Sequence, residues 1–173
     1  MAHSLELLVD DATDAAVRLE WTALADAGLP SQANHRSPSN RPHVTVAVSD
    51  HISPDVDPLL SEVVGELPLE CRLGAPVVFG GRSLTLARLV VPSAALLGFQ
   101  DRVSVACAPH LTPGPFPHSV PGRWTPHVTL CRRLAPSDLP AALAVLGRDD
   151  LVGVFDRLRR WDGDARVDTV LGS

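Results

Sequence analysis

Two histidines in this chain each stand two residues before a threonine, inside the same tetrapeptide. Pro-His-Val-Thr occurs twice and supplies His43 with Thr45 and His127 with Thr129. If both copies lie in strands, alternation places each histidine and its threonine on one face. Imidazoles titrate near neutrality, so one could accept a proton while the other donates one, and the hydroxyls could hold phosphate oxygens. The duplicated motif therefore predicts phosphate-ester chemistry with these four residues as the catalytic set.

The residues around the two motifs repeat one order of expected elements: strand, helix, loop, histidine strand, helix, strand, strand. In the first copy, 4–80, these are strand 4–10, helix 13–27, loop 31–41, the strand of His43, a short helix ending near 65, and strands 67–73 and 76–79. In the second copy, 83–173, they are strand 84–91, helix 93–107, loop 108–126, the strand of His127, helix 137–146, and strands 151–161 and 165–171. We therefore expect one bilobal α+β domain over 1–173. Each lobe should have an antiparallel sheet and helices and bring one histidine to a central cleft.

Composition places the chain among ordinary globular proteins. Of its 173 residues, 45% are hydrophobic and 20% charged. No apolar run reaches the length of a membrane span, and the first residues lack the basic and apolar segments of a secretory signal. Three cysteines without a Cys-x-x-Cys pair predict reduced thiols and a cytoplasmic protein. The oligomeric state stays open.

The charge balance limits the partners that we expect. All 15 basic residues are arginine, against 20 acidic residues, for a net charge of −5. A net negative chain is a poor binder of long duplex nucleic acid, because non-specific affinity depends mainly on phosphate neutralisation. A local cleft lined by arginine could still hold a nucleotide or a short RNA end, since guanidinium groups suit phosphate oxygens.

The paired motifs, His43-Val44-Thr45-Val46 and His127-Val128-Thr129-Leu130, carry a resemblance to a known family. One His-x-Thr strand per lobe, in a chain of this size, resembles the two-histidine (2H) phosphoesterase superfamily, in particular its 2′-5′ RNA ligase and cyclic nucleotide phosphodiesterase branch. The resemblance implies a bilobal fold, a site without metal, and substrates that carry 2′,3′-cyclic phosphates or 2′-5′ linkages. Arg132, just after the second motif, is similar to an arginine often found there in ligase-like members.

Further residues near the motifs are candidates for substrate binding. Arg41 would face the same side as His43 if its strand starts early. Arg123 and Trp124 lie in the proline-rich loop 108–126, where they could meet a phosphate and stack on a base. The alternative is a rigid surface loop without a role in binding. Arg132 stands an odd number of positions from His127, so alternation turns it away from the cleft unless a bulge re-aims it.

We expect neither a metal nor a cofactor, because the histidines show no ligand spacing and His-x-Thr lacks a carboxylate partner. The preferred function is opening of a 2′,3′-cyclic phosphate or a 2′-5′ linkage by His/His acid–base catalysis. Two alternatives stay open: a nucleotide-binding or RNA-end-binding module without turnover, and an RNA 2′-5′ ligase. The residues do not distinguish which histidine is the acid and which the base.

Overall fold

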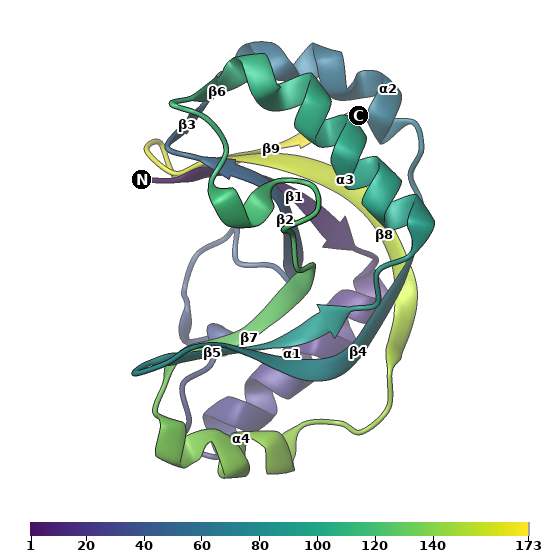
Figure 1. The fold of residues 1–173 in the computed structure, drawn as a ribbon. Coiled ribbons are helices and arrows are strands. Elements are labelled where there is room, and N and C mark those ends of the chain that lie inside the picture. Colours follow the sequence, from purple (N-terminus) through teal and green to yellow (C-terminus); the bar gives the residue numbers. More distant parts are fainter. Residues whose placement is uncertain (173) are drawn as a thin grey trace.

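Seven strands form one antiparallel sheet that bends into two lobes (Figure 1). The structure is a computed structural model that describes residues 1–172. The strand order is β2-β1-β8-β4-β5-β7, and β9 pairs with β8. The strands are β1 (His3–Val9), β2 (His43–Ser49), β4 (Leu69–Gly80), β5 (Leu84–Val90), β7 (His127–Leu134), β8 (Leu151–Asp162) and β9 (Val167–Leu171). The expected α+β class is confirmed.

Each half of the sequence completes its lobe with a strand from the other half. We call β2, β1, β8 and β9 the first lobe, and β7, β5 and β4 the second lobe. Strand β4 precedes the second copy of the repeat but pairs with β5, and β8 belongs to the second copy but pairs with β1. The two exchanged strands also pair with each other, from Leu69 to Leu73 of β4 and from Leu151 to Phe155 of β8. This pairing joins the lobes into one sheet.

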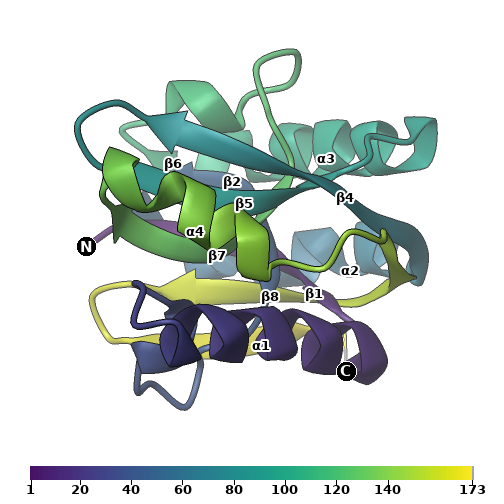
Figure 2. The same ribbon diagram turned by 90° about the horizontal axis from the view of Figure 1, so that it is seen from below.

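The helices cover the outer sides of the two lobes (Figures 1 and 2). They are α1 (Asp11–Asp26), α2 (Ser61–Val64), α3 (Ala94–Cys107) and α4 (Leu139–Val145). The Asp10 carboxylate accepts hydrogen bonds from the first-turn amides of α1, and the Ser93 hydroxyl accepts one in α3. Helix α1 ends before Gly28, whose φ is 72°. No helix among residues 1–172 has the length and apolar character needed to cross a membrane.

Each long helix packs against the histidine strand of the other sequence half. In α1, the Trp21 indole N–H donates to the Thr129 carbonyl in β7 at 3.1 Å. In α3, the Gln100 amide donates to the Val46 carbonyl in β2 at 3.3 Å. Apolar residues of both helices and of the strands form one continuous core, which includes Val17, Leu24, Phe99 and Val103. The two histidine strands are therefore held from behind by buried side chains.

Two segments differ from the sequence-based expectation. The expected strands 67–73 and 76–79 are one strand, β4, because the chain at Gly74 and Ala75 forms a bulge rather than a break. The expected loop 108–126 contains a two-residue strand, β6 (Leu111–Thr112), which pairs with β3 (His51–Ile52). Such short pairings depend on tertiary contacts and leave no periodic signal in the sequence.

Candidate active site

Both motif histidines are held by the same local hydrogen bond. The Nδ1 atom of His43 lies 2.7 Å from the Arg41 carbonyl oxygen, and Nδ1 of His127 lies 2.7 Å from the Thr125 carbonyl oxygen. A carbonyl can only accept, so Nδ1 carries the proton in each ring. In the neutral form, Nε2 then has a free lone pair, and in the protonated form it has a proton to give. The two rings are therefore prepared in the same tautomer.

Each histidine lines a pocket of about 340 Å³, and Arg132 lines both pockets. The first pocket is formed by Glu6, Gln32, His35, Ser39, Asn40, His43, Arg132, Arg159 and Trp161. The second pocket is formed by Phe79, Thr85, His118, Arg123, Thr125, His127, Thr129 and Arg132. Arg132 is thus the residue that the two pockets have in common, and the charge of His43 acts on the ring of His127.

The position of Arg132 corrects the expectation that alternation turns it away. In the pairing of β5 with β7, Ala87 opposes Thr129 but Leu86 opposes Cys131, so β7 carries an extra residue between them. An extra residue shifts the parity of the strand. Arg132 consequently faces the same side of the sheet as His127, which lies five residues earlier in the chain. Next to Arg132, Arg133 adopts a φ of 61°, beside a second register shift.

The first pocket contains a buried carboxylate beside His43. Oε1 of Glu6 lies 3.6 Å from Nε2 of His43, while Oε2 accepts from Nε and Nη2 of Arg159 at 2.8 and 2.7 Å. Burial raises the pKa of Glu6, but the charges of His43 and Arg159 and the hydrogen bonds of Ser4 and Arg159 more than offset this. Its pKa is below the ordinary value of 4.5, so the carboxylate is ionised at neutral pH.

His127 has a different electrostatic environment. Its ring packs on Phe79, with 4.6 Å between the ring centroids. Burial lowers the pKa of His127, and the positive charges of Arg132, His43 and His118 lower it further. The bond to the Thr125 carbonyl opposes these effects without cancelling them, so the pKa lies below 6.5. The neutral imidazole is thus the favoured form of His127 at pH 7.

Strand register reveals an aromatic residue at equivalent positions in the two pockets. Trp161 of β8 pairs with Ser4 in the first lobe, and Phe79 of β4 pairs with Thr85 in the second. In each lobe one strand lies between the histidine strand and the strand of the aromatic residue. Each aromatic residue lines the pocket of its lobe. Flat aromatic faces at the edge of a phosphate site are suited to stacking on bases.

The two motif threonines lie on the same face as their histidines. Thr129 lines the second pocket with His127. Thr45 pairs with Glu6 across β2 and β1, which puts it on the face that carries Glu6 and His43, although it does not line the first pocket. Thr129 is therefore the better placed of the two to touch a phosphate.

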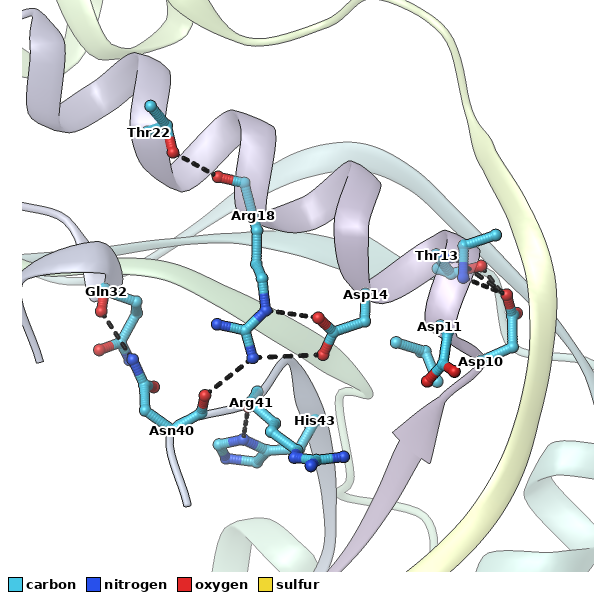
Figure 3. A network of polar contacts seen from close by, with 12 residues as sticks. Asp10, Asp11, Thr13, Asp14, Arg18, Thr22, Gln32, Asn40, Arg41 and His43 are labelled. Carbon is cyan, nitrogen blue, oxygen red and sulfur yellow. Dashed lines mark hydrogen bonds and ion pairs between the residues drawn. The ribbon is translucent and has the colours of Figure 1, made fainter. Parts of the chain in front are cut away.

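Of the three predicted substrate-binding residues, Arg123 lines the second pocket and the other two lie elsewhere. Strand β2 begins at His43, so Arg41 precedes the strand and lines a separate pocket beside Asp11 and Asp14. Figure 3 shows the bond between the Arg41 carbonyl and Nδ1 of His43. It also shows Arg18, which bonds Asp14 and the Asn40 carbonyl and so holds this loop to α1. The condition on which Arg41 would share the face of His43, an early start of the strand, is therefore not met, and its role in substrate binding stays a prediction.

Trp124 has a structural contact that accounts for an aromatic residue in a polar loop. Its indole N–H donates to the Thr45 carbonyl at 2.8 Å, and its ring packs against the core. The side chain therefore links the loop before His127 to the strand of His43. Stacking of Trp124 on a base stays a prediction.

The sequence reading missed the carboxylate partner of His43. Glu6 carries one recognisable signal, since it is a charged residue in an otherwise apolar strand segment, Leu5-Glu6-Leu7-Leu8. Its cation, Arg159, lies in a strand at the far end of the chain, where two adjacent arginines interrupt an apolar pattern. Buried charges in strands are rarely left unpaired, so each residue predicts a partner without identifying it.

Among residues 1–172, one group of side chains has ligand atoms close enough for a metal ion: His3, Asp162 and Asp164. Nδ1 of the buried His3 has no hydrogen-bond partner. A metal bound at Nε2 would place a proton on Nδ1, and ligating histidines nearly always donate that proton to an acceptor. The group thus lacks the outer partner of a built metal site.

Comparison with known proteins identifies a family and a fold. The family model described as the 2′-5′ RNA ligase superfamily matches residues 11–166. The structure of LigT from E. coli, complexed with 3′-AMP, is similar with a TM-score of 0.58 and 16% identity, covering 97% of this chain and 92% of that one. No curated protein sequence matches.

Two further solved structures share the fold. Usb1 from Kluyveromyces marxianus has a TM-score of 0.53 and 14% identity, covering 98% of this chain and 97% of that one. A crystal structure described as a phosphoesterase has a TM-score of 0.55 and 15% identity, covering 98% of this chain and 92% of that one. At these identities the likeness establishes the fold alone.

Proposed function

Because this chain belongs to the 2′-5′ RNA ligase superfamily, we propose that it is a metal-independent phosphodiesterase. Its substrates are nucleotides or RNA ends, on which it opens 2′,3′-cyclic phosphates or cleaves 2′-5′ linkages. The observation that carries this proposal is the matched pair of imidazoles. His43 and His127 are both held at Nδ1 by a carbonyl 2.7 Å away, in pockets that share Arg132.

The catalytic set is His43, His127, Thr45 and Thr129. One imidazole takes the proton of the attacking water or hydroxyl, and the other protonates the leaving oxygen. Negative charge on the equatorial phosphate oxygens is held by hydrogen-bond donors that line the two pockets. Arg132 is the guanidinium best placed for this role, because it alone lines both pockets, and the Thr129 hydroxyl adds a donor.

The second part of the proposal concerns the nucleosides. Arg123 in the second pocket meets a further phosphate or a ribose oxygen. Trp161 and Phe79 offer a stacking face in each pocket, and about 340 Å³ is enough for one nucleoside. The complex of E. coli LigT with 3′-AMP supports a nucleotide as the ligand class. A net charge of −5 favours short ends over long duplexes.

The location that we propose is the cytoplasm. Cys71, Cys107 and Cys131 are all free and buried, and burial raises the pKa of the Cys71 thiol to about 12 and that of Cys107 to about 11. Unpaired, protonated thiols support a reducing compartment.

The test is a turnover assay with excess chelator. The substrates are 2′,3′-cyclic nucleotides, 2′-5′ dinucleotides and short RNAs that end in a cyclic phosphate. We expect the wild type to convert at least one class, and His43→Ala and His127→Ala each to lose about 10²–10⁴-fold in rate. His110→Ala is the matched control, because His110 lines neither pocket, and it should keep full activity.

Other results would select an alternative. Binding of these ligands without turnover would indicate a binding module on the same fold. Joining of a 5′-hydroxyl end to a cyclic phosphate, faster than hydrolysis, would indicate a 2′-5′ ligase. Activity that disappears with chelator and returns with a divalent ion would contradict the metal-independent mechanism.

A further inference from the structure

The two lobes are nearly equivalent around their histidines, but their charges differ. His43 pairs with Leu8 and His127 with Leu89, so the neighbouring strands are in the same register. Two residues further along the histidine strands, Thr45 opposes Glu6, whereas Thr129 opposes Ala87.

The third strands complete this comparison. Glu6 pairs with Arg159 of β8, and Ala87 pairs with Val77 of β4. A buried ion pair in the first lobe thus occupies the positions of two small apolar residues in the second.

This ion pair is rigidly held. Glu6 and Arg159 are 5% and 3% exposed, and Ser4 donates its hydroxyl to Oε1 of Glu6 at 2.6 Å. Arg159 also donates to the Ser39 carbonyl at 2.8 Å and contacts Asp168 at 3.0 Å. The carboxylate cannot turn away without breaking these bonds, so it stays 3.6 Å from Nε2 of His43.

The charged groups around the two imidazoles differ. His43 faces the anion Glu6 together with the cations Arg159 and Arg132, and His35 lines the same pocket. The near oxygen of Glu6 lies 3.6 Å from Nε2 of His43, and Arg159 is bound to the far oxygen of that carboxylate.

His127 faces the cations Arg132 and Arg123, the imidazole of His118 and the ring of Phe79, without an acidic residue among the lining of its pocket. An anion favours the imidazolium and cations favour the neutral ring.

We propose that Glu6 is a positioning residue for His43, and that its carboxylate beside Nε2 makes His43 the general acid and the first pocket the place of the leaving alcohol. This inference rests on the proposed function and specifies which pocket holds the nucleophile and which holds the leaving group. His127, which has no anion beside it, is the general base, and the nucleophile enters from the second pocket.

The reaction step balances with these two proton transfers. The nucleophile, water or a ribose hydroxyl, gives its proton to Nε2 of His127 as its oxygen forms a bond to phosphorus. The bond from phosphorus to the leaving oxygen breaks, and that oxygen takes the proton from Nε2 of His43. Afterwards His127 is protonated and His43 neutral, and exchange with solvent restores the starting forms.

The experiment compares two substrates that differ only in the leaving alcohol. One is a nucleoside phosphodiester with a ribose 5′-hydroxyl as the leaving group, and the other is the same diester with 4-nitrophenol, which departs without protonation. We expect His43→Ala to lose at least ~10²-fold on the first substrate and less than ~10-fold on the second. His127→Ala should lose ~10²-fold or more on both.

The role of Glu6 is tested with Glu6→Gln and Glu6→Asp. Glu6→Gln should reproduce the leaving-group dependence of His43→Ala with a smaller loss, and move the alkaline limb of the pH–rate profile to lower pH. Glu6→Asp, which restores the charge, should recover part of the rate on the ribose-leaving substrate.

Asp57→Asn is the matched control. Its carboxylate accepts from Arg160, the neighbour of Arg159 in β8, at 2.7 and 2.9 Å, and so forms an ion pair like that of Glu6. Asp57 lines neither pocket. It removes a similar ion pair from the same strand and should leave both the leaving-group dependence and the pH profile unchanged.

Two results would overturn the inference while leaving the proposed function intact. One is leaving-group dependence in His127→Ala instead of His43→Ala. The other is an equal loss on both substrates in Glu6→Gln, with an unshifted pH profile. If the wild type converts no phosphodiester at all, both the proposed function and this inference fail. Failure of the inference alone is therefore distinguishable from failure of the proposed function.

Discussion

Trp124 and Thr45 come from different halves of the sequence, and the indole N–H of Trp124 donates to the Thr45 carbonyl at 2.8 Å. The contact connects the loop that precedes His127 to the strand that carries His43. Trp21 makes the reverse connection, from α1 of the first half to Thr129 in the strand of His127. Each histidine strand is thus anchored by an indole from the other half of the chain, which fixes the strands relative to each other.

We expect Trp124→Phe to loosen this arrangement. Loss of one half-buried hydrogen bond should lower the free energy of unfolding by about 0.5–1.5 kcal/mol, because the Thr45 carbonyl loses its donor while the aromatic ring remains. Urea unfolding measures the change, and kcat should fall while KM for a nucleotide substrate changes little. Unchanged stability of Trp124→Phe would contradict the structural role of this hydrogen bond. A raised KM for Trp124→Leu, with KM unchanged in Trp124→Phe, would support stacking of the ring on a base.

Arg132 is expected to be the main phosphate ligand. Arg132→Ala should lower kcat by about 10²–10³-fold, the usual effect of removing one donor to a developing phosphate charge. Arg132→Lys should recover only part of this, because an ammonium group lacks the guanidinium fork. The control is the adjacent Arg133→Ala, which removes an exposed arginine outside both pockets. Equal losses in both variants would point to general electrostatic attraction instead.

The buried pair of Arg88 and Glu20 should dominate the stability of the second lobe. Arg88 is 1% exposed, and besides Glu20 it donates to the carbonyls of Gly74 at 2.9 Å and Gly147 at 2.6 Å. Arg88→Met leaves a carboxylate buried without its cation, so we expect a loss of about 3–5 kcal/mol in urea unfolding. The double variant Arg88→Met/Glu20→Met should be more stable than Arg88→Met alone. A double variant that adds the two single losses would refute coupling between these residues.

The pH dependence of catalysis should follow His127. As the general base it must be neutral, and burial and nearby cations hold its pKa below 6.5. The acidic limb of kcat/KM should therefore lie below pH 6.5, since the ring stays unprotonated down to that lower value. Phe79→Ala, which exposes the ring, should raise the limb towards 6.5.

An NMR titration of the His127 imidazole checks this assignment directly. His51 is the internal reference, because it is exposed and lines neither pocket. A midpoint for His127 above 6.5 would contradict the prediction.

Much of the fold and the core of the site could be predicted from short-range pattern. The period of two in strands is enough to put His43 beside Thr45 and His127 beside Thr129, and the repeated order of elements is enough for two lobes. These features depend only on residues that are close in the sequence, so the sequence alone is enough to predict them. The family resemblance rested on the same residues and is confirmed by the match over 11–166.

The tertiary structure decided everything that depends on register and on distant pairing. A single extra residue in β7 turned Arg132 into the cleft, and the exchange of β4 and β8 brought Arg159 to Glu6 and Phe79 to His127. Alternation counts residues along one strand and cannot detect a bulge. The ion pair between Glu6 and Arg159 forms only when β1 and β8 pair in the correct register. The chain alone therefore specified two equal histidines, and only the folded sheet made them unequal.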